Sequence, residues 1–314
     1  MTKLLIPYIN KRKNYKFFKN RDLLNHIITE IVNRNNCSWE DKKRIITTKI
    51  KKFFYKNKAN VLLIGLSGGV DSSLVTTLAV EAVGEKNVFA VNLPFFKDEK
   101  GTLLANILAS SLKLSNFLVI SINEIVQRKI EAINYIGNPL LKIETEKDLQ
   151  NLKDKIRIGN LASRTRISIL YDLSKALHGL VLGTGGKVEF MLGYLAKYGT
   201  PFSYDYGILN NLYKAEIYIL AKNLNIPEEI INAEPTTGYY IGQTHEDELG
   251  ATLEELDAIS YLLFEIKENP AEIIEKYKVE ENFVKKIIEI HNKTKHKRQL
   301  FNSYIKIGKC SKQK

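Results

Sequence analysis

The segment Leu66–Ser73, with the sequence LSGGVDSS, has the residue types of a phosphate-binding loop. Gly68 and Gly69 let the backbone turn tightly and come close to a ligand. The unpaired N–H groups at the start of a following helix favour an anion, and serine hydroxyls add donors. Asp71 would repel a bare anion, but it suits Mg²⁺, which binds through one or two carboxylates and phosphate oxygens. The alternative is an ordinary glycine-rich turn with a capping Asp or Ser.

The elements around this loop indicate the fold class. Val61–Leu66 is a short apolar run that predicts a buried strand, and Ser72–Val83 has a helical pattern that ends at Gly84. Further apolar runs predict three more strands, at Val88–Leu93, Asn116–Ile120 and Gly179–Leu182. Helical patterns are found between the strands and near both ends, at Asp22–Asn33, Trp39–Lys56, Thr102–Leu112, Ile122–Ile136, Ile167–Leu177, Leu212–Leu224, Leu253–Glu268 and Val279–Ile290. The alternation predicts an α/β fold with a doubly wound parallel sheet flanked by helices.

Composition excludes several classes of protein. The chain has 314 residues, of which 44% are hydrophobic and 26% charged, so it is neither disordered nor collagen-like. Two cysteines exclude a disulfide scaffold and a multi-cysteine zinc site. No apolar run approaches the roughly 20 residues of a membrane helix, and the N-terminus lacks the pattern of a signal peptide. We therefore expect a cytoplasmic protein without a membrane partner.

The net charge of +12 is spread unevenly. Residues 1–60 carry +12, residues 285–314 carry +9, and the part between them carries −9. Basic ends allow a nucleic-acid surface. In the N-terminal part, however, apolar residues such as Ile46, Ile50 and Phe53 interrupt the lysines at helical spacing, so a solvated helix face explains the charge. Nucleic acid is therefore not the expected partner.

The loop resembles the SGGxDS signature of the ATP pyrophosphatase (PP-loop) superfamily, whose members cleave ATP between the α- and β-phosphates and form an adenylated intermediate. Later segments resemble ammonia-dependent NAD synthetase, and they occur in that family's order: 159–166 (GNLASRTR), 181–189 (VLGTGGKVE), 192–194 (LGY), 197–199 (KYG), 212–214 (LYK), 234–236 (EPT), 242–250 (GQTHEDELG) and 296–298 (HKR). The similarity spans about residues 40–300. It implies an adenine nucleotide alpha hydrolase-like domain over residues 36–300, with a basic N-terminal extension (1–35) and a basic C-terminal tail (301–314).

The resemblance also implies a reaction. The carboxylate of deamido-NAD attacks the α-phosphate of ATP, pyrophosphate leaves, and ammonia displaces AMP from the acyl adenylate to give NAD. Mg²⁺, ATP as co-substrate and a homodimer are implied as well. Glutamine-dependent relatives carry an extra amidase domain with a catalytic cysteine, and 60 residues are too few for one. We therefore expect free ammonia, or ammonia from a separate protein, as the nitrogen source.

Site residues follow from the matching motif positions. ATP binding is implied for Gly65, Leu66, Ser67, Gly68, Gly69, Val70, Asp71, Ser72, Ser73, Thr184, Lys214 and Thr236. Asp71 and Lys214 are the expected catalytic residues, and Asp71 and Glu189 the expected Mg²⁺ ligands. Deamido-NAD binding is implied for Asn160, Arg164, Lys197, Asp205, His296 and Lys297. Without the resemblance, Glu189 is typical of a helix N-terminus, and Lys214 and the 291–298 run are typical of solvated charges.

One departure from the family pattern keeps alternatives open. Thr200, Pro201 and Phe202 stand where the family has an acid and glycines, in its nicotinate and ammonia region. Smaller departures are Ser163 in place of an alanine, Gly186 in place of Asn or His, and Val188 in place of Ser or Ala. A PP-loop paralogue that adenylates a different carboxylic acid or carbonyl is therefore the main alternative. A tRNA-modifying enzyme ranks below it, because the tRNA thiolation cysteines are absent. An inactive nucleotide-binding protein is disfavoured, because Asp71 and Glu189 are both present.

Overall fold

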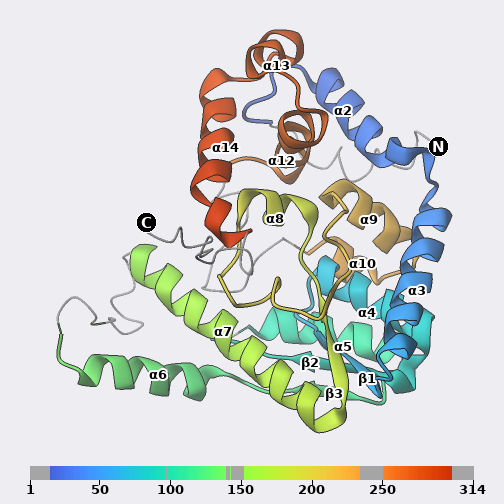
Figure 1. The fold of residues 1–314 in the computed structure, drawn as a ribbon, viewed down its shortest axis with the longest axis vertical. Helices are drawn as coiled ribbons and strands as arrows, with labels where there is room; N and C mark the ends of the chain where they lie inside the picture. The colour runs from blue at the N-terminus through green and yellow to red at the C-terminus, as the bar shows by residue number, and fades with distance from the viewer. Residues whose placement is uncertain (1–14, 97, 139–141, 143–151, 234–249, 299–314) are drawn as a thin grey trace, which may run out of the picture.

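A five-stranded parallel sheet lies in the lower part of the computed structural model as Figure 1 draws it. The structure describes residues 15–96, 98–138, 142, 152–233 and 250–298. The strands are β1 (Val61–Gly65), β2 (Val88–Asn92), β3 (Phe117–Val119), β4 (Gly179–Gly183) and β5 (Tyr206–Gly207). Their order is β3-β2-β1-β4-β5, and all four neighbouring pairs are parallel. The order reverses between β1 and β4, which is where open α/β sheets bind ligands at the carboxyl ends of their strands.

Helices precede, connect and follow the strands. Their bounds are α2 (Arg21–Asn33), η2 (Arg34–Asn36), α3 (Trp39–Lys56), α4 (Val70–Val83), η3 (Glu85–Asn87), α5 (Glu99–Ser111), α6 (Asn123–Tyr135), α7 (Leu152–Leu177), α8 (Lys187–Leu192), α9 (Lys214–Asn223), α10 (Glu228–Ile231), α12 (Leu253–Ser260), the π-helical η4 (Tyr261–Ile266), α13 (Pro270–Tyr277), α14 (Glu281–Lys293) and η5 (Lys295–Lys297). In the ranges that the structure describes, no helix has both the length and the apolar character that crossing a membrane requires.

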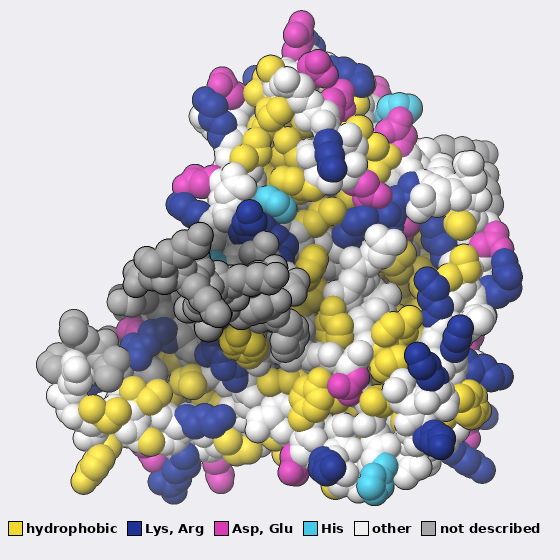
Figure 2. Space-filling model, viewed as in Figure 1, with side chains coloured by type: hydrophobic (Ala, Val, Ile, Leu, Met, Phe, Trp, Pro, Cys, Tyr) yellow, Lys and Arg dark blue, Asp and Glu magenta, His cyan; other side chains and the backbone are white. Residues whose placement is uncertain are grey.

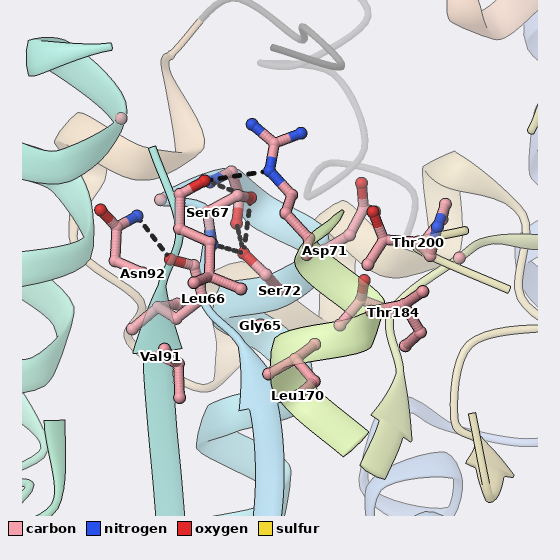
Figure 3. A pocket seen from close by; sticks show the side chains of 18 of the residues that line it. Gly65, Leu66, Ser67, Asp71, Ser72, Val91, Asn92, Leu170, Thr184 and Thr200 are labelled. Atoms are coloured by element: carbon pink, nitrogen blue, oxygen red, sulfur yellow. Dashed lines mark hydrogen bonds between the residues drawn. The ribbon is translucent and has the colours of Figure 1, made fainter. Parts of the chain in front are cut away.

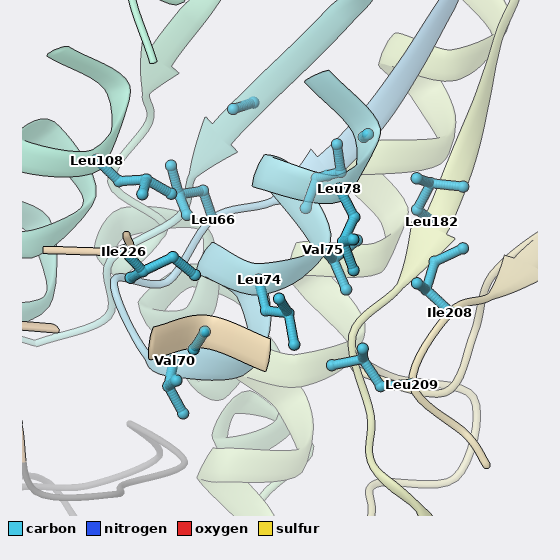
Figure 4. Close-up of a cluster of buried hydrophobic side chains, with 14 of the residues drawn as sticks. Leu66, Val70, Leu74, Val75, Leu78, Leu108, Leu182, Ile208, Leu209 and Ile226 are labelled. Carbon is cyan, nitrogen blue, oxygen red and sulfur yellow. The ribbon is translucent and has the colours of Figure 1, made fainter. Parts of the chain in front are cut away.

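Both faces of the sheet are covered. Leu62 and Ile64 of β1 join a buried cluster with side chains of α3, α4, α5 and α9 (Figure 4). Leu63, between them in sequence, belongs to a different cluster with side chains of α6 and α7. Successive strand residues point to opposite faces, so this alternation means that helices pack on each side. The doubly wound α/β class predicted from the sequence is confirmed.

A separate helical core joins the two ends of the chain, at the top of Figure 1. Leu24, Ile27, Ile28 and Ile31 of α2 are buried against α12, α13 and α14, and their spacing makes one apolar stripe along α2. Just before α2, Phe18 pairs with Val279 in an antiparallel bridge. The helices expected near both ends therefore pack against each other.

The basic surface of the N-terminal part lies on α3. Four exposed lysines follow this helix, while Ile50 and Phe54 on its other side are buried; the lysines are Lys49, Lys51, Lys52 and Lys56. Figure 2 shows Lys and Arg side chains along the right side of the molecule, where α3 runs in Figure 1. An amphipathic helix with a solvated face accounts for this charge.

The structure also differs from the sequence-based expectations. Helix α7 begins at Leu152, although the apolar pattern indicated a start at Ile167. Strand β5 and helix α8 were not expected, because elements of two and six residues are too short to show a period. The single helix expected over Leu253–Glu268 is α12 followed by a π-helical turn, which ends at Lys267 in a left-handed conformation (φ 61°).

Candidate active site

A cavity of about 220 Å³ opens at the carboxyl ends of β1, β2 and β4, at the reversal of strand order (Figure 3). Its walls come from the loop after β1, from α5 and α7, and from the segments after β4. The lining residues used below are Gly65, Leu66, Ser67, Gly68, Gly69, Asp71, Ser72, Asn92, Gly101, Leu104, Arg166, Thr184, Gly185, Glu189, Thr200, Pro201 and Ser203. A small-molecule site is expected at this place in an open α/β sheet.

The loop after β1 is held by its own serines. The Ser72 hydroxyl donates to the Gly69 carbonyl (3.0 Å), and the Ser67 N–H donates to Ser72 Oγ (3.2 Å). Gly69 is the N-cap of α4 and has no side chain to occupy the first N–H groups of the helix. Helix α4 is 14 residues long, and its N-terminus presents N–H donors and the positive end of the helix dipole at the cavity.

Asn92, at the end of β2, fixes the other side of the loop. Its side chain is buried, its Nδ2 donates to the Leu66 carbonyl (2.8 Å), and its Oδ1 accepts from Thr102 Oγ1 (2.9 Å). Sequence reasoning missed this residue. The available signal was that Asn92 is a lone polar residue at the end of an apolar strand. The hydrophobic pattern alone does not assign a role to such a residue.

Gly68 is required by both its conformation and its surroundings. Its φ is +85°, and a Cβ there would collide with the Gly101 carbonyl and lie 3.0 Å from Leu104 Cβ. A side chain would therefore push the loop away from α5 and change the anion site.

We expect Gly68→Ala to lower kcat/KM for ATP at least 30-fold, because the loop must shift to relieve the collision. Pyrophosphate release measured against ATP concentration checks this result. Gly84→Ala is a matched control, because Gly84 has nearly the same φ (+84°) but a Cβ there meets nothing within 4 Å. Equal kinetic losses in both variants would mean that backbone strain, not loop position, causes the effect.

Three charged side chains from three helices meet beside this loop. Lys214 Nζ lies 2.6 Å from Asp71 Oδ2 and 3.3 Å from Glu189 Oε1. Burial lowers the pKa of an ammonium, but the two carboxylates outweigh that effect and raise the pKa of Lys214 above its usual range. Lys214 is therefore a buried, fixed cation that contacts two carboxylates of the cavity wall without lining the cavity itself. Glu189 Oε2 also accepts from the Gly186 N–H, so this residue both caps α8 and faces Lys214.

The start of α9, which carries Lys214, is fixed by Asp257. The Asp257 carboxylate accepts from the N–H groups of Lys214 (3.2 Å) and Ala215 (2.8 Å). Burial raises the pKa of Asp257 to about 8, although both hydrogen bonds oppose that shift. Sequence reasoning missed Asp257, because only the fold brings α12 against α9.

Asp71 and Glu189 are the best candidates to hold a metal ion. Among the described residues, no three His, Cys, Asp or Glu side chains gather into a metal site. Two carboxylates beside an anion-binding loop nevertheless fit Mg²⁺, which completes its coordination with phosphate oxygens and water.

The other residues assigned to ATP divide into two groups. Thr184 lines the cavity, together with the loop residues Gly65 to Gly69 and Ser72. Val70 and Ser73 are buried in the first turn of α4 behind it. Thr236 lies outside the described residues.

None of the six residues assigned to deamido-NAD is in the cavity wall as far as the structure describes it. Arg164 and Lys197 do come together, since Arg164 Nε donates to the Lys197 carbonyl (3.0 Å). Arg166, which had no assigned role, lines the cavity instead and donates from Nε to the Leu93 carbonyl (2.9 Å). The signal that could have identified Arg166 as a site residue is its place in the SRTR segment, residues 163–166. Asn160 lies on the same helix, α7.

Asp205 and Lys297 contact backbone groups. Asp205 accepts from the Val181 N–H (2.8 Å) and from the Tyr171 hydroxyl (3.2 Å). Burial is the main cause that raises the pKa of Tyr171 to about 12, and the charge of Asp205 adds to it. Lys297 Nζ donates to two carbonyls after α8, those of Gly193 and Leu195 (both 2.9 Å), and burial lowers its pKa. His296 is exposed. The substrate-binding roles of these residues stay predictions.

The segment that departs from the family pattern lines the cavity. Thr200, Pro201 and Ser203 are part of its wall, and Ser163 Oγ donates to the Thr200 carbonyl (3.0 Å). A Cβ on Gly185 would collide with the Phe202 ring, so this segment packs closely against the loop after β4. The unusual residues at positions 163 and 200 therefore contact each other at the cavity.

Comparison with known proteins identifies the family of the sequence and of the fold. The sequence matches the family model for NAD synthase over residues 42–301. The NH(3)-dependent NAD(+) synthetase of Pyrococcus horikoshii is 34% identical over 255 residues, or 81% of this chain and 92% of that protein. The structure of NMN synthetase from Francisella tularensis aligns with a TM-score of 0.69 at 25% identity, over 85% of this chain and 99% of that chain. An NH3-dependent NAD synthetase from Campylobacter jejuni aligns with a TM-score of 0.66 at 26% identity, over 87% and 100%. The chain belongs to the NAD synthase family, and it is therefore a ligase of NAD biosynthesis that forms a carbon–nitrogen bond with ATP as co-substrate.

Proposed function

We propose that the chain converts deamido-NAD and ammonia to NAD through an acyl adenylate, with release of pyrophosphate and then AMP. The observation that carries this proposal is the fixed ammonium of Lys214, held by Asp71 and Glu189 beside the Ser67–Gly69 loop. Such a group neutralises the charge that develops when a carboxylate attacks a phosphate.

The chemistry explains why this arrangement is needed. A free carboxylate does not react with ammonia at neutral pH, because an oxide ion is a very poor leaving group. Adenylation converts that oxygen into part of AMP, which leaves readily. The loop and α4 bind and orient the phosphates, Lys214 stabilises their charge, and no covalent nucleophile of the protein is needed.

Mg²⁺ is the divalent ion that we propose for Asp71 and Glu189. When bound, it would neutralise phosphate oxygens and favour departure of pyrophosphate. The two carboxylates come from α4 and α8, on either side of Lys214, so the protein can hold the ion next to the ammonium.

Several finer assignments stay predictions from the sequence. They are the homodimer, the cytoplasmic location, free ammonia as the nitrogen source, and the division into an N-terminal extension (1–35), a synthetase domain (36–300) and a C-terminal tail (301–314).

The proposed reaction has a direct test. Purified chain incubated with deamido-NAD, ATP, Mg²⁺ and an ammonium salt should form NAD, AMP and pyrophosphate in equal amounts, as measured by chromatography. Omission of ammonia should stop NAD formation. Pyrophosphate release with other acids but none with deamido-NAD would contradict the proposal.

A second candidate function is the amidation of a smaller substrate, an acid that lacks the second nucleotide of deamido-NAD. The Francisella tularensis protein is an NMN synthetase. Thr200 and Pro201, two of the residues at which this sequence departs from the NAD synthetase pattern, are part of the cavity wall. The amide product NMN would require the corresponding mononucleotide acid. Competition between the two acids in one reaction gives the ratio of their kcat/KM values, and a ratio above about 100 identifies the substrate.

A further inference from the structure

A network of buried and half-buried charges lies outside the cavity of the candidate active site. It links η2, α3, α8, α9 and η4, and its members are Arg34, Lys42, Lys187, Glu216 and Glu265. The side chains of Arg34 and Glu216 are 8% and 1% exposed. Charges this deeply buried need well-placed partners, so the geometry of the network is strongly determined.

Arg34 is at the centre of this network. Its Nη2 and Nε donate to Glu216 Oε2 (2.8 and 3.1 Å), and its Nη1 donates to Glu265 Oε1 (3.0 Å). The same guanidinium also donates to the Asn211 carbonyl and lies over the Tyr213 ring, 5.1 Å from its centroid. A planar guanidinium can make all these contacts at once, whereas a lysine ammonium cannot.

The partners of Arg34 hold the first turns of two site helices. Glu216 accepts from the Tyr213 N–H (3.0 Å) at the start of α9, and Lys214 is the first residue of that helix. Glu265 accepts from Lys187 Nζ (2.6 Å), and Lys187 is the first residue of α8, two positions before Glu189. Arg34 thus connects the helix start that carries Lys214 with the one that carries Glu189.

Other contacts also hold the α8 side of this connection. Helix α8 has only six residues and packs against α12 and α14. Besides Glu265, three contacts tie the two helix starts: the Lys187 N–H donates to the Leu212 carbonyl (3.0 Å), Lys187 Nζ donates to Asn211 Oδ1 (3.1 Å), and Lys214 pairs with Glu189. Glu265 is the carboxylate that joins Lys187 to Arg34. Burial and the adjacent Glu265 raise the pKa of the Tyr213 hydroxyl, which therefore keeps its proton and donates to Glu265 as well (2.7 Å).

Arg34 is in turn fixed by the helix that precedes it. Its backbone N–H donates to the Ile31 carbonyl at the end of α2, whose apolar side is buried against the C-terminal helices. Arg34 also precedes residue 42, where the family match begins. The N-terminal segment therefore reaches the site helices through the Arg34 side chain as well as through the packing of α2 on α9.

We propose that Arg34 is a positioning residue, which sets the spacing of Lys214 and Glu189 for adenylation by holding Glu216 and Glu265 together. This inference rests on the proposed function. Arg34 belongs neither to the cavity wall nor to the loop after β1. Its effect on the reaction therefore passes through the starts of α8 and α9.

Kinetics of five variants test this role. Arg34→Met removes the charge, Arg34→Lys keeps the charge without the fork, and Glu265→Gln breaks the same link from its other end. We expect Arg34→Met and Glu265→Gln to lower kcat for NAD formation about 10- to 100-fold, with KM for ATP changed less than threefold. Arg34→Lys should show a smaller loss of kcat. The double variant that combines Arg34→Met with Glu265→Gln should lose little more kcat than either single variant. Arg44→Met, on the exposed side of α3, should stay within twofold of wild type.

The outcomes separate positioning from general stability. A folded Arg34→Met variant with wild-type kcat overturns the inference. It is also overturned if the kcat losses of Arg34→Met and Glu265→Gln add fully, as free energies, in the double variant. If Arg34→Met does not fold, Arg34→Lys and Glu265→Gln decide by the same kcat criterion. Wild-type protein that makes no NAD from deamido-NAD contradicts the proposed function instead, whereas wild-type activity equalled by all these variants contradicts only the role of Arg34.

Discussion

Lys214→Met is expected to lower kcat for NAD formation by a factor of about 10³, because it removes the ammonium that Asp71 and Glu189 hold beside the Ser67–Gly69 loop. Methionine has nearly the length of lysine, so packing in the start of α9 changes little. The same loss should appear in pyrophosphate release with ammonia omitted, since the ammonium acts before ammonia does. Single-turnover measurement of pyrophosphate checks the adenylation step alone.

The variant should also show a pH-dependent loss of stability. Without the ammonium, two carboxylates lie close together, and their repulsion raises the pKa of one of them above its value in the unfolded chain. The folded state then binds more protons, so the free energy of unfolding falls as pH rises. Both carboxylates keep some solvent contact (25% and 15% exposed), so we expect a deficit of ~1–3 kcal/mol at pH 7.5 that shrinks at pH 5. Denaturant unfolding at the two pH values measures it.

Lys222→Met is the matched control, because Lys222 is an exposed residue of the same helix. It should retain wild-type kcat and wild-type stability at both pH values. A Lys214→Met variant with more than a tenth of wild-type kcat would contradict the assignment of Lys214 to the adenylation step.

The position of the loop after β1 could be predicted because its signal is local. Glycines, serines and an acid between an apolar run and a helical pattern indicate a turn at the end of β1, whereas phosphate as its ligand stays a prediction. Strands β1 to β4 could be predicted for the same reason, since a run such as Val61–Leu66 is buried on both faces of a parallel sheet. Elements without a period of their own, such as α8, could not.

Contacts between distant residues lie beyond what periodicity can give. Lys214 is 143 positions from Asp71, and only the packing of α9 against α4 brings them to 2.6 Å. The family resemblance assigned both residues to the site but could not supply that distance. Arg34 had no local signal at all, because Glu216 and Glu265 are 182 and 231 positions away. In an N-terminal segment rich in lysine, nothing separates one buried arginine from its solvated neighbours.

The composition of the loop and the position of Lys214 together explain why Asp71 is compatible with the groups that we propose to bind phosphate. A carboxylate at the start of α4 benefits from the helix dipole, and the ammonium 2.6 Å away neutralises it before any nucleotide binds. The carboxylate therefore does not repel the phosphates, and it remains available to a divalent ion that arrives with them.

Asp71→Asn and Glu189→Gln are each expected to lower kcat about 10²- to 10³-fold and to raise the Mg²⁺ concentration that gives half-maximal rate, because each replaces a charged ligand with a neutral one of the same shape. Glu81→Gln is the control on α4, since Glu81 pairs with Lys43 away from the cavity. It should leave the Mg²⁺ dependence unchanged.

Thermal unfolding without ATP gives a readout that does not depend on turnover. In Lys214→Met the two carboxylates lack their cation, so Mg²⁺ should bind between them and raise Tm by several degrees, following the linkage between binding and stability. Adding Glu189→Gln or Asp71→Asn to Lys214→Met should abolish that rise, since one carboxylate holds Mg²⁺ only weakly. A rise of equal size in the double variants would place the ion elsewhere, whereas loss of the rise in both would assign Mg²⁺ to the carboxylates of α4 and α8 that now flank Lys214.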